Sequence, residues 1–283
     1  MDRKRLRRWL VGDFSFRRAL LSLLEIYLCV LVYAYFFTDR TIFQPQPSSY
    51  VDGPDITRIR TSDGAAISAM YLPRTNAEFM ILHSHGNAED LGDIRPVLEM
   101  LRDRGFSVLA YDYRGYGTSG GKASERNAYR DAEAAYAYAV SDLGIPPSRI
   151  IVHGRSVGAA LALHLAARSQ VGGVFLESPF VSAFRMKTII PLAPFDKFSN
   201  IRIIRRISCP VLVVHGMRDE AIPPWHGRKL FDAANAPKLS LWVEGAGHDD
   251  VIWAAGDSYW NALHRLVDLI RTSQQSRQAK SQQ

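Results

Sequence analysis

A single serine lies between two glycines in a segment whose residue types suit nucleophilic catalysis. Gly154-Arg155-Ser156-Val157-Gly158 has the spacing GxSxG, follows the apolar run 150–152 and precedes a stretch of helical periodicity. A turn that joins a strand to a helix this tightly leaves room only for small neighbours, which the two glycines provide. The pattern therefore predicts that the Ser156 hydroxyl is exposed at the end of a buried strand, where it can act as a nucleophile.

A serine hydroxyl becomes an effective nucleophile when a histidine accepts its proton and a carboxylate orients that histidine. Asp219 comes just after the apolar run 211–214, and His248 lies in the glycine-containing loop after the run 239–243. Both residues follow predicted strands, and the chain order serine, aspartate, histidine is the one found in α/β-hydrolases. We therefore expect Ser156, Asp219 and His248 to form a catalytic triad.

The carboxylate of this triad has alternatives. Glu220 adjoins Asp219, and Asp249 and Asp250 adjoin His248, although an immediate neighbour in the sequence rarely reaches back to the edge of a histidine ring. No chemistry is assigned to the other histidines. We expect His83 and His215 to brace loops, and the rest to lie on the surface of helices or loops, namely His153, His164, His226 and His264.

Hydrolysis through an acyl-enzyme also needs two backbone N–H groups that bind the oxyanion of the tetrahedral intermediate. The first is expected from Val157, the residue after the nucleophile. The second is expected from the loop Ser84-His85-Gly86-Asn87-Ala88-Glu89-Asp90, which follows the apolar run 79–83. The amide of Asn87 is the predicted donor, and the alternative is that Asn87 is an ordinary turn residue. This chemistry calls for no cofactor and no metal ion.

The elements that must position these residues are short apolar runs that alternate with helix-length segments. Strands are predicted at 56–60, 66–72, 79–83, 107–111, 150–152, 174–176, 211–214 and 239–243, and helices at 91–104, 124–143, 157–168, 225–233 and 258–271. Buried strands that alternate with helices indicate a mostly parallel sheet with helices on both faces. Reactive residues in such sheets gather at the carboxyl ends of the strands. One α/β domain over 56–271 is therefore expected.

An apolar segment near the amino terminus indicates a membrane anchor. Ala19 to Phe37 contains one charged residue, Glu25, and as a helix would span about 28 Å, close to a hydrocarbon core. Seven basic residues within 1–18, against Arg40 alone soon after the segment, place the amino terminus in the cytoplasm and the domain on the outer, periplasmic or extracytoplasmic, side. A cleaved signal peptide is the first alternative, but no small-residue cleavage site follows. The second alternative is a buried helix of a soluble domain. Such a helix would be apolar on one face only, whereas this segment is apolar on all faces.

The remaining segments set limits on the function. Residues 38–55 are predicted to be a linker with a stiff proline-containing stretch, and the polar tail 272–283 is predicted to be disordered. The formal net charge of +7 resides mainly at the two ends, so the nearly neutral body has no basic stripe for nucleic acid. The two cysteines exclude a disulfide scaffold and form no CxxC metal or redox motif.

A short connection between the runs 174–176 and 211–214 predicts a short cap over the site. It is too short for a deep lid, but it holds apolar side chains that would form a lip, namely Phe180, Phe184, Met186, Ile189, Ile190, Pro191, Pro194 and Phe195. An open site with an apolar rim, close to a bilayer, favours a long acyl chain or a lipidated protein as substrate.

Four segments together resemble the branch of the α/β-hydrolases that includes the α/β-hydrolase-domain depalmitoylases. They are SHGNAEDLG (84–92), YDYRGYG (111–117), GRSVG (154–158) and WVEGAGHD (242–249), and the resemblance covers roughly residues 42–271. It implies an α/β-hydrolase fold and a serine hydrolase of esters or thioesters, with Ser156, Asp219 and His248 at the family triad. Animal depalmitoylases attach through a cysteine-rich, lipidated amino terminus on the cytoplasmic side, whereas this chain has a hydrophobic segment with Cys29 alone.

Three functions compete on these observations. The first is a membrane-anchored serine hydrolase that cleaves acyl esters or thioesters through an acyl-enzyme. The second is a serine peptidase of the same fold, although no subsite for a peptide amine is visible in the sequence. The third is a catalytically silent scaffold, although proteins of that kind usually lack a reactive residue that is present here.

Overall fold

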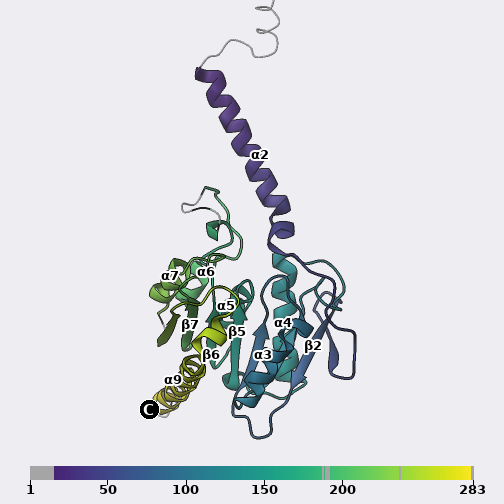
Figure 1. The fold of residues 1–283 in the computed structure, drawn as a ribbon, viewed down its shortest axis with the longest axis vertical. Coiled ribbons are helices and arrows are strands. Elements are labelled where there is room, and N and C mark those ends of the chain that lie inside the picture. The colour runs from purple at the N-terminus through teal and green to yellow at the C-terminus, as the bar shows by residue number, and fades with distance from the viewer. Residues whose placement is uncertain (1–15, 187, 189–191, 236, 282–283) are drawn as a thin grey trace, which may run out of the picture. The chain divides into compact units, whose positions relative to one another are not determined.

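The computed structural model describes residues 16–186, 188, 192–235 and 237–281, and the chain forms two compact units, Met1–Thr41 and Ile42–Gln283. The first contains helix α2, Phe16–Ile42, except for its last residue; the helix has a mean hydropathy of 2.1 over its most apolar window and no buried residue (Figure 1). The helix is longer at both ends than the predicted span 19–37. Most of the predicted basic segment 1–18 lies outside the described residues.

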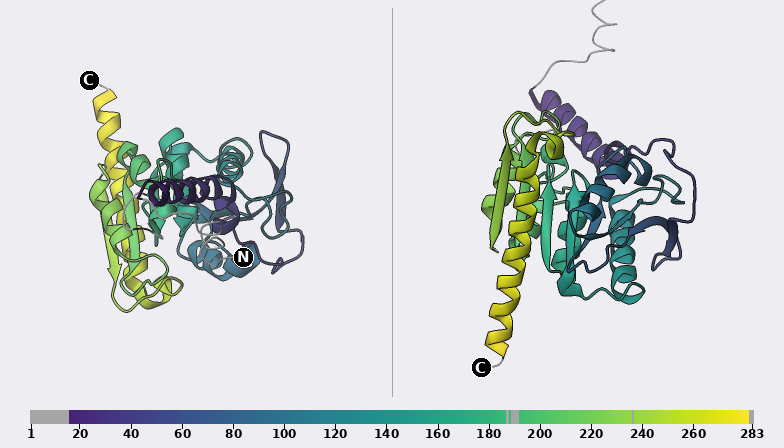
Figure 2. Two further views of the ribbon diagram at one scale, coloured as in Figure 1. Left: turned by 90° about the horizontal axis from the view of Figure 1, so that it is seen from above. Right: turned by 60° about the horizontal axis from the view of Figure 1, so that its bottom comes forward.

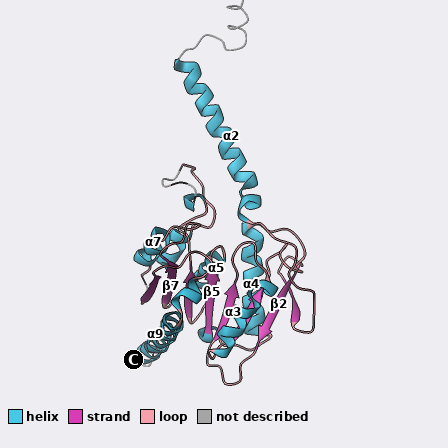
Figure 3. Cartoon of the chain, viewed as in Figure 1, coloured by secondary structure: helices cyan, strands magenta, loops and turns pink. Residues whose placement is uncertain are grey.

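The second unit is built on an eight-stranded sheet with the order β1-β2-β4-β3-β5-β6-β7-β8 (Figure 3). Pairing is antiparallel for β1 with β2 and for β2 with β4, and parallel for all the other neighbours. The strands are β1 (Ile56–Arg60), β2 (Ala66–Leu72), β3 (Met80–Ser84), β4 (Ser107–Tyr111), β5 (Ile150–Arg155), β6 (Gly173–Glu177), β7 (Val211–Gly216) and β8 (Lys238–Val243). The mostly parallel sheet predicted from the sequence is confirmed.

Helices cover both faces of this sheet and bury a separate apolar core on each. The core on one face includes side chains from α3, α8 and α9, and the core on the other includes side chains from α4, α5 and α7. Figure 2 shows α9 running along the strands of the carboxyl-terminal half. The helices are α3 (Leu91–Asp103), α4 (Glu125–Ser141), α5 (Gly158–Arg168), α6 (Asn200–Ile203), α7 (Trp225–Ala233), α8 (Val251–Ala255) and α9 (Asp257–Ser281).

The order of the strands creates a topological switch point beside β3. From β3 the chain crosses to β4 on one side, and from β4 it crosses back to β5 on the other side of β3. Loops that leave the carboxyl ends of β3 and β5 therefore diverge and leave a crevice, which is where ligands bind in open α/β sheets. The loop that contains Asn87 follows β3, and the turn that contains Ser156 follows β5.

The segment between β6 and β7 is a short cap, as predicted. Its described residues contain only the short helix α6 and two 3₁₀ turns, η2 (Phe184–Met186) and η3 (Ile204–Arg206). Phe180 is buried, and the rings of Phe184 and Phe195 meet edge to face with centroids 5.7 Å apart. Residues 189–191 of the predicted apolar lip lie outside the described residues.

The stretch predicted as a linker, 38–55, divides in two: its first residues end helix α2, and from Phe43 onward it contacts the domain. Phe43 is buried and packs on Tyr116 and Phe198, with ring centroids 6.4 and 5.9 Å away. Further along, the backbone N–H of Ser49 donates to Asp90 Oδ2 at 2.8 Å. The proline-containing stretch 44–49 suggested a stiff spacer, but Phe43 and the hydrogen bond of Ser49 hold this segment to the domain.

The tail predicted to be disordered is helical as far as it is described. Helix α9 continues through Ser281. In this last part of the helix, Gln274 Nε2 donates to the Ser148 carbonyl at 2.7 Å and Arg277 Nη2 donates to the Ser208 carbonyl at 3.0 Å. Apolar periodicity stops near Arg271, but glutamine, arginine, alanine and lysine all favour helix. The polar residues therefore extend the helix without needing a core of their own.

Candidate active site

Ser156 lies in the sharp turn between β5 and α5. Its backbone has φ +53°, in the left-handed region, and its N–H donates to the Glu177 carbonyl at 2.9 Å. A Cβ added to Gly154 would lie 2.1 Å from the Gly158 carbonyl oxygen, and one added to Gly158 would lie 2.0 Å from the Ser84 carbonyl oxygen. Because both obstacles are backbone atoms, only glycine fits at these two positions. The turn that the sequence predicts is therefore present.

The three predicted triad residues lie within hydrogen-bonding distance of one another. His248 Nε2 is 3.2 Å from Ser156 Oγ, and His248 Nδ1 is 2.8 Å from Asp219 Oδ2. The Asp219 side chain is fully buried, whereas that of His248 retains 18% exposure. Of the alternative carboxylates, Glu220 is exposed, and Asp249 binds Arg155. The structure therefore pairs His248 with the carboxylate that was preferred from the sequence.

Asp219 is held ionised by the groups around it. Burial alone would raise the pKa of this carboxyl, but hydrogen bonds from His215, His248 and the Ile222 N–H outweigh it and lower the pKa strongly. The Ile222 N–H donates to Oδ1 at 2.7 Å, and His215 Nε2 lies 3.3 Å from Oδ2. His215 thus braces the carboxylate loop, as expected. A carboxylate fixed on three sides can hold the His248 ring in one orientation.

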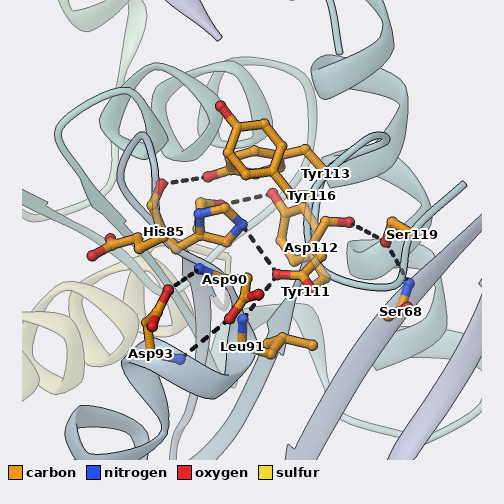
Figure 4. A network of polar contacts seen from close by, with 12 residues as sticks. Ser68, His85, Asp90, Leu91, Asp93, Tyr111, Asp112, Tyr113, Tyr116 and Ser119 are labelled. Atoms are coloured by element: carbon orange, nitrogen blue, oxygen red, sulfur yellow. Dashed lines mark hydrogen bonds and ion pairs between the residues drawn. The ribbon is translucent and has the colours of Figure 1, made fainter. Parts of the chain in front are cut away.

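The loop after β3 is held by a buried network of polar contacts from the segment 111–119 (Figure 4). The Tyr113 hydroxyl donates to the His85 carbonyl at 2.5 Å, and His85 Nε2 lies 3.4 Å from Asp112 Oδ1. Burial lowers the pKa of His85, but the hydrogen bond and attraction to Asp112 raise it overall. Asp112 Oδ1 also accepts the Leu91 N–H at 3.0 Å, and this bond joins the segment 111–119 to the start of α3.

The two predicted oxyanion donors lie on the loops that this geometry brings to the crevice. Val157 occupies the N-cap position of α5, where backbone N–H groups and the helix dipole favour negative charge. The side chain of Asn87 makes structural hydrogen bonds: its Oδ1 accepts the Tyr116 hydroxyl at 2.5 Å and the Gln44 N–H at 3.0 Å. The Asn87 side chain fixes the loop, and its backbone amide remains our expected donor.

Some residues near the site differ from the sequence expectation. His153 and His226 are buried, not on the surface: His153 stacks on Phe175, and His226 Nδ1 accepts the Val181 N–H at 3.2 Å. Their positions within or beside apolar segments were the available signal. The sequence reasoning also missed the ion pair between Glu89 and Arg155, whose members are far apart in the chain. Within the described part of the chain, no group of three His, Cys, Asp or Glu side chains is placed to hold a metal ion.

Comparisons with known proteins agree with this architecture. A family profile described as serine aminopeptidase, S33 (Hydrolase_4) matches residues 75–200. Among solved structures, the Pyrococcus furiosus esterase Pf2001 superposes with a TM-score of 0.67 at 21% identity, covering 80% of this chain and 98% of that one. A monoacylglycerol lipase from Paleococcus ferrophilus gives a TM-score of 0.56 at 20% identity, covering 72% and 98%. At these identities the two structures establish the fold alone.

Sequence relatives define the family more narrowly. Human alpha/beta hydrolase domain-containing protein 17B is 40% identical over 219 residues, which are 75% of this chain and 73% of the relative. The 17C protein of Xenopus tropicalis is 36% identical over 228 residues, covering 78% and 71%. The resemblance inferred from four short motifs thus extends over most of both chains. The chain belongs to the α/β-hydrolases, in the family of the alpha/beta hydrolase domain-containing 17 proteins.

Proposed function

We propose that this protein is a membrane-anchored serine hydrolase that cleaves carboxylic esters or thioesters of acyl chains through an acyl-enzyme. The observation that carries the proposal is the continuous relay Ser156 Oγ, His248, Asp219, with contacts of 3.2 and 2.8 Å. The relay is set at a switch point of the sheet, beside the N-terminus of α5. A nucleophile, a base, an orienting carboxylate and a site for negative charge are then together in one crevice.

The chemistry follows from this arrangement. His248 Nε2 accepts the Ser156 proton as Oγ attacks the acyl carbonyl carbon, and the amides of Val157 and Asn87 bind the oxyanion. Collapse of the intermediate expels the alcohol or thiol, which takes the proton from His248. Water then attacks the acyl-enzyme with His248 again as base, and the carboxylic acid leaves as Ser156 recovers its proton. Asp219 stays ionised throughout and orients the imidazole.

An ester or thioester is preferred to a peptide because of how the nearby carboxylates are used. An aminopeptidase needs a carboxylate that is available to bind the substrate's α-amino group. Beside the His248 loop, Glu89 and Asp249 both bind Arg155, and Asp250 Oδ1 accepts the Gly247 N–H at 2.6 Å. The family profile nevertheless carries the description serine aminopeptidase, so peptide substrates belong in the test.

Membrane attachment through α2 is part of the same proposal. The helix is long enough to cross a bilayer, and its most apolar window has a mean hydropathy of 2.1. The basic residues that precede it support a cytoplasmic amino terminus and a hydrolase domain on the outer side. A lipidated or long-chain acyl substrate would share the membrane with the enzyme, and the apolar residues of the cap between β6 and β7 would favour such a chain.

The test uses the full chain, purified in detergent, and a fluorophosphonate probe that labels activated serines. We expect labelling of the wild-type protein and none of Ser156→Ala, with kcat on p-nitrophenyl esters reduced by about 10⁶-fold. Ser169→Ala, at the far end of α5, is the matched serine control and should label normally. Ester, thioester and aminoacyl p-nitroanilide panels of increasing chain length then separate an esterase from a peptidase. A folded wild-type protein that never labels would contradict the proposal.

A further inference from the structure

Arg155, the second residue of the GxSxG turn, contacts the loops on both sides of the nucleophile. Its Nη1 donates to Glu89 Oε2 at 2.6 Å, in the loop that follows β3. Its Nη2 donates to the Asp249 carboxylate and lies 3.4 Å from the His248 carbonyl oxygen, in the loop that follows β8. One guanidinium at the end of β5 therefore joins the oxyanion loop and the histidine loop.

Glu89 transmits this contact to the backbone of the oxyanion loop. Its second carboxylate oxygen, Oε1, accepts the Gly86 N–H, one residue before Asn87. A Cβ added to Gly86 would lie 2.7 Å from Glu89 Oε1 and 3.1 Å from Arg155 Nη1, so both side chains lie against the backbone there. The conformation of the peptide just before the expected oxyanion donor is thus set by the pair Arg155–Glu89.

The guanidinium also lies close to a third carboxylate, that of Glu177. Arg155 Nε lies 3.7 Å from Glu177 Oε1, and the other oxygen of the buried Glu177 accepts the Tyr259 hydroxyl at 2.5 Å. The planar fork of arginine can serve three carboxylates at once, which the single ammonium of lysine cannot do with the same geometry. The side chains of Arg155 and Glu89 are only 16% and 18% exposed, so their charge-assisted bond is weakly screened by water.

We propose that Arg155 is a positioning residue, which acts through Glu89 and Asp249 to hold the oxyanion loop and the His248 loop in their places beside Ser156. This inference rests on the proposed function, because the positions of these loops matter only if the loops perform catalysis. Arg155 does not touch the reacting atoms. Its contribution is geometric: displacement of a catalytic group by about 1 Å can cost about 10²-fold in rate.

The experiment compares Arg155→Gln, Arg155→Lys, Glu89→Gln and Asp249→Asn in the full chain, using p-nitrophenyl ester kinetics. Arg155→Gln is expected to lower kcat by about 10- to 100-fold with KM changed less than about twofold, because the loops shift while the acyl site remains. Arg155→Lys should recover part of the loss. The double variant Glu89→Gln with Arg155→Gln should lose no more than Arg155→Gln alone, since both changes break the same unit.

Asp249→Asn is included because it is expected to fold normally: the Asp249 side chain is 84% exposed, and its substitution removes only one of the contacts of Arg155. It should lower kcat by a smaller factor than Arg155→Gln. The matched control is Glu78→Gln, which removes one carboxylate from the Arg271–Glu78 ion pair away from this cluster. That variant should keep kcat within about twofold of wild type.

Amide hydrogen exchange tests the same inference by a measurement that does not depend on activity. Arg155→Gln should increase exchange in both 84–90 and 245–250, and Glu78→Gln should increase it in neither. Unchanged exchange in both loops, or full kcat for Glu89→Gln and Asp249→Asn together, would overturn the inference while leaving the proposed function intact. An inactive wild-type protein would instead refute the proposed function, and the exchange pattern would still decide whether Arg155 holds the loops.

Discussion

His226 is a buried histidine whose Nδ1 accepts a backbone N–H, which requires that this ring nitrogen carry no proton. Its Nδ1 accepts the Val181 N–H at 3.2 Å, and the ring stacks on Trp225 with centroids 3.7 Å apart. Burial lowers the pKa of His226 to about 4, helped by positive charge around it. The charged or titratable groups that face it are His215, Arg185, Asp219 and Lys229.

Because the folded-state pKa lies below the ordinary 6.5, the unfolded chain takes up this proton first as the pH falls. His226 therefore favours the folded state least at acid pH, and stability should decline from about pH 6.5 towards about pH 4. We expect His226→Asn, which keeps an acceptor for the Val181 N–H but cannot titrate, to show a smaller fall in melting temperature between about pH 7.5 and about pH 5. His264→Asn, on the exposed face of α9, serves as control. An unchanged pH slope for His226→Asn would refute the assignment.

At the scale of elements, the close approach of α5 to β3 is what exposes the nucleophile. A Cβ at Gly158 would lie 2.0 Å from the Ser84 carbonyl oxygen, so Gly158→Ala must push the helix away from the strand. We expect a loss of at least about 1–3 kcal/mol in the free energy of unfolding and loss of fluorophosphonate labelling. Chemical denaturation and the probe measure the two effects.

Gly120→Ala is the matched control, because nothing lies within 4 Å of an added Cβ and its φ is not positive. That variant should keep both the stability and the labelling of the wild type. If Gly158→Ala behaved in the same way, the turn would be less tightly packed than the structure indicates.

Periodicity in the sequence located the elements well where apolar residues dominate them. The bounds of β1, β2, β4 and α7 agree with the prediction residue for residue. Strand β5 was predicted to end at Val152 but continues to Arg155, because pairing with β3 and β6 extends the ladder through residues that are polar or glycine. Side-chain polarity does not reveal backbone pairing of this kind.

The candidate site was predictable to the extent that its chemistry depends on residue type. Serine, histidine and aspartate at strand ends identified the three residues that the structure brings together. The partners that hold them were not predictable: Arg155 meets Glu89 across 66 positions and Asp249 across 94. A contact between residues so far apart depends on strand order, which one sequence does not state.

For the whole molecule, the boundary between helix α2 and the α/β-hydrolase domain is not evident from the composition of the chain. The compact unit starts at Ile42, and Phe43 directly after it is 4% exposed in the core. The next residue, Gln44, donates its N–H to Asn87 Oδ1, on the expected oxyanion loop. The first residues after the helix are therefore part of the catalytic domain, although their composition resembles a spacer.

Two truncations test this division. Deletion of residues 1–41 should move the protein from the membrane pellet to the supernatant and leave hydrolysis of short p-nitrophenyl esters within about threefold of the full chain. Deletion of residues 1–47 also removes Phe43 and Gln44, and it should lower the melting temperature and cost at least about tenfold in kcat, since removal of a buried phenylalanine alone costs about 3–5 kcal/mol. The two truncated proteins differ by six residues, so equal activity would show that Phe43 and Gln44 do not support the site.

The side of the membrane on which the domain lies can be tested by labelling. Ser276→Cys in a cysteine-free full chain should react with an impermeant maleimide on intact cells. Reaction only after lysis would place the domain in the cytoplasm and reverse the proposed topology.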